Sequence, residues 1–326
     1  MIQGSLFEQD FLVRTLGTLA QSPHVALTEL VANAWDAGAS YVAITMPDEY
    51  DQQMIVKDDG CGMTPEQFRC RWMTLGYDRV RHQGVSADFP AERADWKRRA
   101  FGRNGVGRHG LLCFGPEYQV ESVRDGKGGR YLVRNTAGED PFVLVSEEIL
   151  EAEGHGTALS AKVTRNLPSP DSIREVPSAR FLHDPRFTVL VNGQSVPLSE
   201  HSGLINRIML RVMNDLEVEA FFIDSAKAAR TTQHQGIAFW VGGRLVGVPS
   251  WILGTRAVID GRTTIAKRHT VVIKAEGLFD EVLPDWSGFR ESETVKKLHE
   301  SVGPICRRDV QALVEGAHPG HDGNRT

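Results

Sequence analysis

The sequence predicts a mixed α/β protein of two domains, and three observations support this prediction. The chain has 326 residues, 41% of them apolar and 24% charged, which is typical of globular proteins of about two domains. Its first half begins with a helical pattern and continues as short strands, whereas its second half alternates strands with helical stretches. The stretch RNLPSPDS separates the halves, because prolines and serines at this density sustain neither periodicity.

The first domain is predicted to span residues 1–166. It opens with a helix that begins near Pro23 and stops at Gly38, with proline and glycine at the ends where helices prefer them. Short apolar runs then predict six strands: Tyr41–Met46, Met54–Lys57, Tyr118–Val123, Arg130–Asn135, Phe142–Ser146 and Thr157–Val163.

The second domain is predicted to span residues 171–291, with a helical stretch around Leu204–Asn214. Its strands are expected at Phe187–Asn192, Val218–Ile223, Gly236–Val246 and Thr270–Glu276. A C-terminal helix is expected over residues 292–315, followed by a disordered tail over 316–326, which is polar and contains Gly and Pro.

Composition excludes several classes of protein. No apolar run approaches the roughly 18 residues that a membrane span needs, and the first residues lack the features of a signal peptide, so we expect a cytoplasmic protein without a membrane partner. The cysteines Cys61, Cys70, Cys113 and Cys306 are scattered without metal-site spacing and are expected to be reduced thiols. A net charge of -5 gives no overall attraction to nucleic acid.

The first helix separates into two faces on a 100° wheel. Leu27, Leu30, Val31 and Ala34 fall on one side and form a core face. Glu29, Asn33 and Asp36 fall on the opposite side, so a carboxylate, an amide and a second carboxylate share one surface. This face is either a solvated polar surface or a binding surface, and the helix alone does not decide between them.

A second motif, MIVKDDGCGMTPEQF, follows an apolar strand. The strand delivers Asp58 at its end, turns on Gly60 and Gly62, and enters a helix that Thr64 and Gln67 cap reciprocally. A tight turn alone would explain the glycines, but it would not require an aspartate at the strand end.

A third motif is the glycine loop GRNGVGRHG at residues 102–110. Glycines at this density let backbone N–H groups approach a polyphosphate, and Leu111-Leu112 predict a following helix whose N-terminus favours anions. Residues 105–110 also read as G-x-G-x-x-G, but the preceding WKRRAFGRN is not the apolar strand that a dinucleotide fold needs. A dinucleotide-dependent oxidoreductase is therefore a minor alternative.

The region around this loop is basic. Between Gly76 and Gly110, eight Lys and Arg residues stand against four acidic residues, a local balance of +4. The region is either a solvated surface loop or a basic lid that offsets the charge of a triphosphate.

Four motifs together carry a resemblance to a known family. ELVANAWDA, DDGCGM, GRNGVG and GHGTAL occur in the order and approximate spacing of the nucleotide-binding motifs of the GHKL ATPases, the superfamily of gyrase B, heat-shock-90 chaperones, histidine kinases and MutL. The resemblance covers residues 20–165 and implies a Bergerat α/β sandwich that binds ATP and Mg²⁺. More loosely, the second half resembles the transducer-like second domain of MORC-type and heat-shock-90-type ATPases.

The resemblance also implies roles for individual residues. Glu29 would be the catalytic base that activates water, Asn33 would bind Mg²⁺ through ATP, and Asp58 would accept a hydrogen bond from the adenine amino group. Gly62 would give room for the base, Thr157 would support Asp58, residues 76–101 would form a lid, and Asp36 would contact the nucleotide or only tie the helix to the lid. The remaining residues implied at the nucleotide are Gly60, Met63, Gly102, Arg103, Asn104, Gly105, Val106 and Gly107.

The sequence departs from the family pattern in its second half. The position that would align with a phosphate-sensing basic residue is Trp286, and Arg262, Lys267 and Arg290 are alternatives among which the sequence does not choose. This departure puts efficient hydrolysis in doubt more than nucleotide binding.

These observations favour a Mg²⁺-dependent ATPase. By the resemblance, ATP would make a transient homodimer through the lid and the N-terminal segment MIQGSLFEQDFLV, and the resulting clamp would act on a protein or DNA client. The alternative is a nucleotide-binding regulatory subunit with negligible turnover. A small basic patch on the final helix, KK at 296–297 and RR at 307–308, is either a DNA contact or a solvated helix face.

Overall fold

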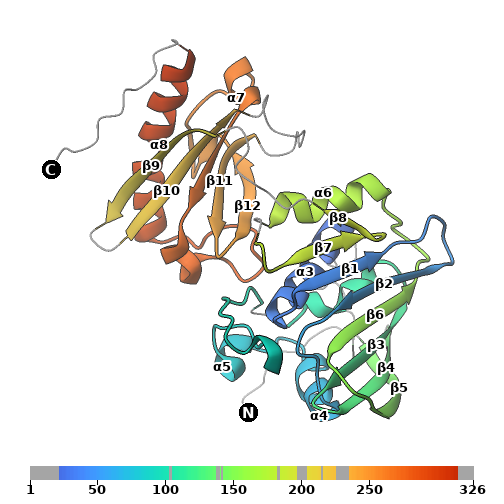
Figure 1. Ribbon diagram of the computed structural model, residues 1–326. Coiled ribbons are helices and arrows are strands. Elements are labelled where there is room, and N and C mark those ends of the chain that lie inside the picture. Colours follow the sequence, from blue (N-terminus) through green and yellow to red (C-terminus); the bar gives the residue numbers. More distant parts are fainter. Residues whose placement is uncertain are drawn as a thin grey trace, which may run out of the picture. The chain divides into compact units, whose positions relative to one another are not determined.

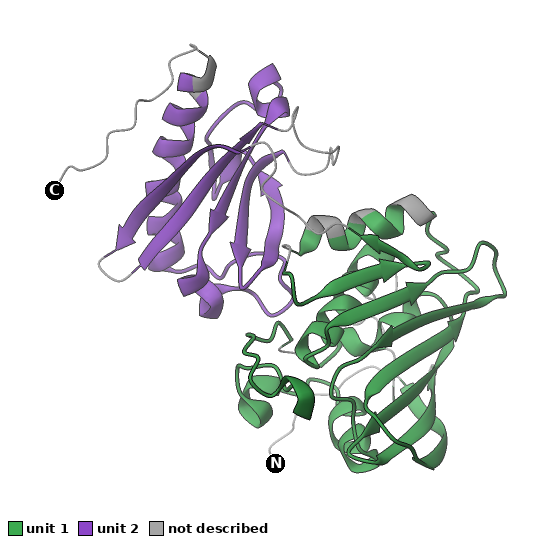
Figure 2. Cartoon of the chain, in the orientation of Figure 1, with its two compact units in different colours: residues 1–198 green, residues 199–326 purple. Residues whose placement is uncertain are grey.

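A computed structural model describes residues 22–102, 105–136, 140, 142–181, 184–196, 204–213, 216–224 and 235–314. The chain divides into two compact units, residues 1–198 and 199–326, which are described separately (Figure 2). Within the described ranges, no helix has the length and apolar character required to cross a membrane. All four cysteines are free thiols, as the sequence predicts.

Unit 1 is built on an eight-stranded mixed sheet with the order β5-β4-β3-β6-β2-β1-β7-β8 (Figure 1). The strands are β1 (Tyr41–Thr45), β2 (Gln53–Asp58), β3 (Glu117–Arg124), β4 (Lys127–Asn135), β5 (Phe142–Glu151), β6 (Gly156–Lys162), β7 (Thr188–Val191) and β8 (Gln194–Val196). The helical segments are α3 (Pro23–Asp36), α4 (Pro65–Gln67), η1 (Phe68–Trp72), α5 (Arg79–Gln83), η2 (Ala91–Arg93), η3 (Gly107–Cys113) and α6 (Pro170–Arg180).

One face of this sheet is covered and the other is more open. Burial alternates along β1 and β2, as expected for a sheet with helices on one side. The covered face includes Ile44, Val56 and Leu159, which lie side by side in register on β1, β2 and β6. Helix α3 packs against η3 and α6 over the sheet.

Helix α3 confirms the prediction from periodicity. Ser22 caps its first turn, and Leu27, Leu30, Val31 and Ala34 are all buried. The opposite face carries Glu29 and Asn33, which are half-buried. Its amphipathic pattern therefore places a polar face beside the core.

The boundary between the two units lies later than the linker signal predicts. The prolines and serine at 168–170 begin α6 instead of forming a linker: Pro170 occupies the first helical turn and the Ser169 side chain accepts from Ser172 N (3.3 Å). The predicted strand at Phe187–Asn192 is β7, which pairs in parallel with β1 and thus belongs to unit 1. Because α6 and β7 complete the first sheet, unit 1 extends to residue 198.

Unit 2 is a second α/β layer with a five-stranded sheet in the order β12-β11-β15-β10-β9. Its strands are β9 (Leu204–Met213), β10 (Leu216–Asp224), β11 (Gly236–Val241), β12 (Arg244–Ser250) and β15 (His269–Lys274), with a small hairpin of β13 (Ile252–Leu253) and β14 (Arg256–Ala257). The helical segments are α7 (Thr264–Arg268), η4 (Glu276–Glu281) and α8 (Glu293–Val314). Both units are α/β, which confirms the predicted fold class.

The helix expected around Leu204–Asn214 is wrong, because these residues form the edge strand β9. The apolar spacing fits a helix, but the segment pairs antiparallel with β10, and Arg211 forms an ion pair with Glu217 across the ladder (3.2 Å). The predicted C-terminal helix is confirmed as α8, which buries one apolar side, including Leu298 and Val302. The predicted tail at 316–326 lies outside the described residues.

Candidate nucleotide-binding site

Helix α3 is the element at which motifs distant in the sequence meet. At its middle, a Cβ atom built on Gly107 would overlap Oε2 of Glu29, so the glycine loop lies directly against this carboxylate. At its last residue, the Asp36 carboxylate accepts a hydrogen bond from Gly102 N (2.6 Å). The glycine loop therefore meets α3 at two points.

Asp58 ends β2 on the sheet face that the helices cover, because it shares strand parity with the buried Met54 and Val56. The register places Thr157 beside it on β6, and Ser122 beside Thr157 on β3. The Oδ1 atom of Asp58 accepts a hydrogen bond from the backbone N–H of Gly60 (2.8 Å). The turn after β2 thus fixes one oxygen of this carboxylate.

The protein around Asp58 makes its carboxyl unusually basic. Burial raises the pKa of Asp58 to about 7, and the nearby Asp59 carboxylate also raises it, whereas the Gly60 and Thr157 backbone N–H groups lower it. A hydrogen-bond donor from a ligand would favour the charged form and lower this pKa. A carboxyl group whose pKa is shifted to near 7 by its surroundings is a candidate for a functional site.

Ser122 joins two of the predicted site residues. Its hydroxyl accepts from Met63 N (2.9 Å) and lies 3.0 Å from Oγ1 of Thr157. Ser122 is fully buried, so these contacts fix the backbone after the glycine turn against β3 and β6. Ser122 was not predicted from the sequence, although a hydroxyl in phase with Tyr118 and Val120, on the apolar side of a strand, was a usable signal.

Glu29 and Asn33 lie one turn apart on α3, as neighbours at i and i+4 do. The amide nitrogen of Asn33 is buried and has no hydrogen-bond partner among the described residues. Buried polar groups are normally hydrogen-bonded, so this amide fits a polar ligand. Its oxygen is a neutral, hard ligand of the kind that Mg²⁺ accepts beside phosphate oxygens and water.

The glycine loop differs from the expectation in one respect. The helix expected to follow the loop begins inside it: η3 (Gly107–Cys113) is a seven-residue 3₁₀ helix with a kink at His109, and it includes Leu111-Leu112. Phosphate binding at its N-terminus stays a prediction. Gly105 and Val106 are half-buried, with Gly105 close to Tyr77, and the predicted Arg103 and Asn104 lie outside the described residues.

Gly62 is required by its own protein surroundings. It has φ of +62°, and a Cβ atom there would overlap the backbone oxygen of Val123 on β3. These two facts explain the glycine without a ligand. Room for a nucleotide base at Gly62 stays a prediction.

The sequence left two roles open for Asp36, a contact with the nucleotide or a link between the helix and the lid. The structure shows the link. Besides Gly102 N, its carboxylate accepts from Phe101 N (2.6 Å), so both oxygens bind backbone N–H groups. The side chain is buried, and these contacts hold the end of the lid against the end of α3.

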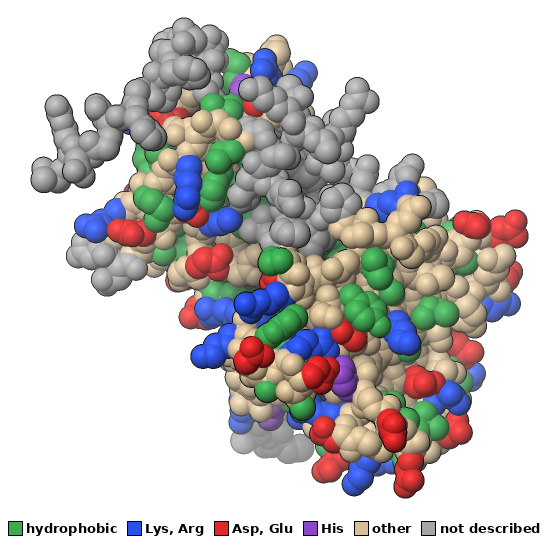
Figure 3. All heavy atoms as spheres, in the orientation of Figure 1, with side chains coloured by type: hydrophobic (Ala, Val, Ile, Leu, Met, Phe, Trp, Pro, Cys, Tyr) green, Lys and Arg blue, Asp and Glu red, His purple; other side chains and the backbone are tan. Residues whose placement is uncertain are grey.

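Several arginines of the lid, and Arg108 in the glycine loop, bind backbone oxygens of the protein. The buried Arg79 donates to backbone oxygens of Gly84 (2.9 Å) and Ser86 (2.7 Å), and the buried Arg98 donates to Ala39 O (2.9 Å). Arg93 and Arg108 likewise donate to backbone oxygens, of Asp59 and Arg71. Bonds to neutral carbonyl oxygens orient these arginines and leave their positive charge in place, so the expectation that the lid charge offsets a triphosphate stays a prediction. Exposed acidic and basic side chains also lie on the lid (Figure 3).

Asp59, which was given no role from the sequence, holds the start of β1. Its carboxylate accepts from the backbone N–H groups of Ser40 (2.7 Å) and Tyr41 (3.0 Å) and from the Ser40 hydroxyl (2.5 Å). Burial opposes ionisation, but these hydrogen bonds and the nearby Arg93 outweigh it and lower the pKa of Asp59. Asp59 is therefore held in its ionised form, whereas the pKa of its neighbour Asp58 lies near 7.

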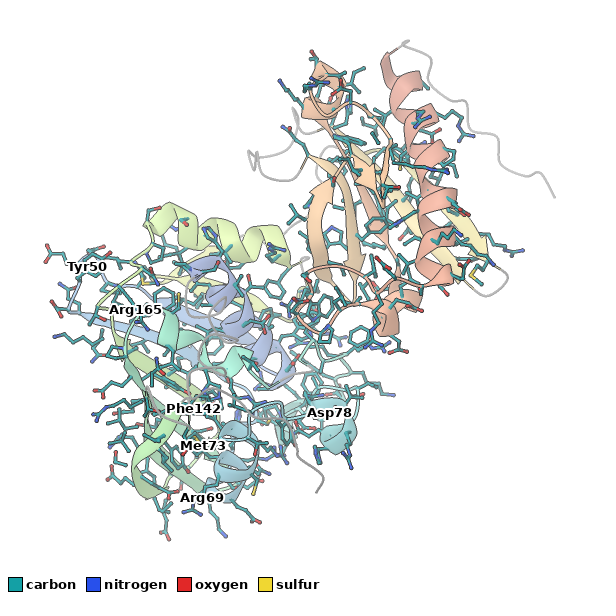
Figure 4. The ribbon with its side chains drawn as sticks, turned by 180° about the vertical axis from the view of Figure 1, so that it is seen from behind. Tyr50, Arg69, Met73, Asp78, Phe142 and Arg165 are labelled. Atoms are coloured by element: carbon teal, nitrogen blue, oxygen red, sulfur yellow. The ribbon has the colours of Figure 1, made fainter. Side chains whose placement is uncertain are left out.

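A buried aromatic cluster supports η3 from the side away from α3. Nδ1 of His109 lies 2.6 Å from the Tyr118 hydroxyl, which also accepts from Nε1 of Trp72 (2.9 Å). The ring of Phe142, labelled in Figure 4, packs on His109 with centroids 4.0 Å apart. Burial lowers the pKa of His109 to about 3, so this histidine is neutral and structural.

The second-half candidates for phosphate sensing have different environments within unit 2. Trp286 is buried beneath the guanidinium of Arg244 (4.7 Å from the ring centroid) and has φ of +59°. Arg262 forms an ion pair with Asp260 (3.1 Å) and is exposed, as are Lys267 and Arg290. Their predicted role at a phosphate stays open.

Comparison with known proteins gives one family match and several partial matches to relatives. Residues 21–149 match the family described as histidine kinase-, DNA gyrase B- and HSP90-like ATPase. The DNA mismatch repair protein MutL of Paramagnetospirillum magneticum is 41% identical over 52 residues, which are 16% of this chain and 9% of that protein. MutL of Rhodospirillum rubrum is 49% identical over 52 residues, 16% of this chain and 8% of that protein.

A third relative is matched over a longer stretch. The putative type II restriction enzyme HgiDII of Herpetosiphon aurantiacus is 25% identical over 124 residues, 37% of this chain and 18% of that protein. The chain thus spans less than a fifth of the length of each of these relatives. The family match agrees with the order of the motifs and with the α/β fold of unit 1, so residues 21–149 are similar to ATPases of the GHKL superfamily.

Proposed function

We propose that this protein binds Mg²⁺-ATP in unit 1 and hydrolyses it. The observation that carries the proposal is the row of polar groups along α3. It consists of the Glu29 carboxylate against the glycine loop and, one turn further on, the Asn33 amide, whose buried nitrogen has no hydrogen-bond partner among the described residues. A bound Mg²⁺ would neutralise phosphate charge and orient the terminal phosphate.

Each residue then has a role suited to its surroundings. Asn33 would bind the metal through its amide oxygen, and Glu29 would take the proton of an attacking water, because a carboxylate is a suitable general base. Asp58 would accept the adenine amino group, and its binding would favour the ionised carboxylate. An analogue without this amino group would leave a buried acceptor unpaired, which gives base selectivity.

Calorimetric titration with Mg-ATP tests the binding step. We expect Asp58→Asn to abolish binding, whereas Asp125→Asn, a matched change at an exposed turn residue, leaves it unchanged. Absence of ATP binding by the unaltered protein contradicts the proposal. Binding of NAD in its place would restore the oxidoreductase alternative.

Phosphate release tests the hydrolysis step and separates the ATPase from a regulatory subunit. Glu29→Gln should remove turnover and retain ATP binding, since the amide cannot accept a proton from water. If phosphate release by the unaltered protein equals that of Glu29→Gln, the chain is a nucleotide-binding module with negligible turnover.

Members of the GHKL family often dimerise, and an ATP-gated homodimer is the proposed working form of this chain. The N-terminal segment expected to take part lies outside the described residues. Light scattering of the protein with a non-hydrolysable ATP analogue tests this form. A doubling of mass that Asp58→Asn prevents supports it, and a monomer at saturating analogue contradicts it.

DNA is the proposed client. Two observations favour DNA over a protein: the matched relatives are named for DNA mismatch repair and restriction, and unit 2 has a cavity of about 1620 Å³ with a partly basic lining. The lining combines Arg256, Arg290, Lys296, Arg307 and Arg308 with Glu291, Glu293 and Glu300, and contains the rings of Phe239, Phe289 and His299.

The helix that borders this cavity provides a matched test. Lys296 lines the cavity and its neighbour Lys297 does not, although both are exposed on α8. Fluorescence anisotropy with labelled DNA should show weaker binding for Lys296→Ala than for Lys297→Ala, together with a smaller salt dependence. Equal effects of the two changes contradict a contact in this cavity.

A further inference from the structure

Two successive residues of the lid hold the two residues that follow Asp58. Arg93 and Glu92 lie in η2, and the residues they hold are Asp59 and Gly60 of the turn after β2. Arg93 acts directly, whereas Glu92 acts through a histidine.

The first contact is a fork between Arg93 and Asp59. Nη1 of Arg93 donates to Oδ2 of the Asp59 carboxylate (2.7 Å), and Nη2 donates to the backbone oxygen of the same residue. The Arg93 side chain is 8% exposed, so water competes little for these bonds. A planar guanidinium can make both contacts at once, which an ammonium group cannot do with the same geometry.

The second contact passes through His155, which lies in the turn before β6. Its Nδ1 lies 2.7 Å from the backbone oxygen of Gly60, and its Nε2 lies 2.6 Å from Oε1 of Glu92. Both ring nitrogens face acceptors, so a His155 that carries protons on both nitrogens satisfies both contacts. The ring thereby bridges the lid and the turn.

These contacts bear on Asp58 because Gly60 determines the position of its carboxylate. The Gly60 N–H donates to Oδ1 of Asp58, while the Gly60 oxygen is held by His155. On the next residue, Cys61 N donates to Ala37 O (2.8 Å), which fixes the turn to the end of α3. A shift of Gly60 would therefore rotate the carboxylate that recognises the base.

We propose that Arg93 and His155 are positioning residues that set the orientation of Asp58 and with it the preference for adenine. This role rests on the proposed function, in which Asp58 accepts the adenine amino group. Guanine has a carbonyl oxygen in place of that amino group, so a correctly oriented carboxylate favours ATP over GTP. The lid would thus contribute to the choice of base through the turn and without contact with the nucleotide.

The test compares three ligands by calorimetry: Mg-ATP, Mg-GTP and inorganic tripolyphosphate with Mg²⁺. We expect His155→Ala to lower the ratio of ATP to GTP affinity by about tenfold, which corresponds to about 1.4 kcal/mol, and to leave tripolyphosphate affinity within about twofold. Arg93→Lys should have a smaller effect of the same kind, and Glu92→Gln, which retains an acceptor for Nε2, should stay close to the unaltered protein. Arg81→Ala, an exposed residue of the same lid, is the control.

The outcomes separate this inference from the function on which it rests. If the unaltered protein binds tripolyphosphate and no ATP, the proposed function fails and the positioning role fails with it. Two results would overturn the positioning role alone, provided that the unaltered protein binds ATP. In the first, His155→Ala leaves the ratio of ATP to GTP affinity unchanged. In the second, His155→Ala lowers the affinity for tripolyphosphate as much as the affinity for ATP.

Discussion

The backbone of Gly107 lies so close to Glu29 that a single added methyl group would overlap the carboxylate. The glycine loop and the proposed general base therefore constrain each other.

Replacing Gly107 tests this constraint on hydrolysis. We expect Gly107→Ala to displace Glu29 and to lower phosphate release by roughly 100-fold, because small misplacement of a catalytic group is costly, with a smaller effect on ATP affinity. Gly261→Ala is the control, since a Cβ atom there makes only an ordinary contact with Trp251 (3.8 Å). Full activity of Gly107→Ala would show that Glu29 is not held by the loop.

Asp36 is expected to stabilise the fold through the lid. Asp36→Ala leaves the N–H groups of Phe101 and Gly102 without their acceptor, which should lower the free energy of unfolding by about 1–3 kcal/mol in urea titration. Asp48→Ala, at an exposed position, should be nearly neutral. A neutral result for Asp36→Ala would show that other contacts hold the lid end.

The raised pKa of Asp58 predicts a dependence of stability on pH. Its pKa is about 7 in the folded state against 3.8 for the free group, so the folded state binds more protons between these values. Asp58 therefore contributes stability that is present below about pH 4 and lost as the pH rises through 7. Urea unfolding of Asp58→Asn should show a gain over the unaltered protein at pH 8 that disappears at pH 4, and a gain independent of pH would contradict the assignment.

His109 predicts the opposite dependence. Burial lowers its pKa to about 3 from 6.5, so the unfolded state binds more protons between these values and stability falls as the pH drops below 6.5. This one group should contribute a slope of roughly 1.4 kcal/mol per pH unit. His109→Gln should remove that slope between pH 6 and 4 in urea titrations, and His24→Gln, an exposed control, should retain it.

The elements that could be predicted from the sequence are those determined by local pattern. The two faces of α3 and the strand that ends at Asp58 depend on residues three to four or two positions apart, so periodicity found them. β7 belongs to the sheet of unit 1 because it pairs with β1, about 147 residues earlier in the chain. No local pattern in the sequence indicates this pairing. The segment of β9 has helical apolar spacing, and only its pairing with β10 makes it a strand.

The candidate site was predictable to the same extent. The order of the motifs identified Glu29, Asn33 and Asp58, but the partners of the lid arginines could not be read from the sequence. Arg79 and Arg98 bind backbone oxygens. The amino-acid sequence does not indicate which backbone carbonyl groups accept hydrogen bonds from side chains. Charge counting therefore gave the local excess of basic residues and could not give the backbone contacts that orient their side chains.

The late boundary of unit 1 has a consequence for any attempt to isolate the ATPase module. A polypeptide cut at residue 166, where the motif match ends, would lose α6 from the surface of α3 and would leave β1 as a bare sheet edge. Exposed strand edges favour aggregation. A fragment that ends with unit 1 at residue 198 retains the whole sheet around the proposed nucleotide site, and it reaches about forty residues beyond the last recognisable motif, which ends at Leu159.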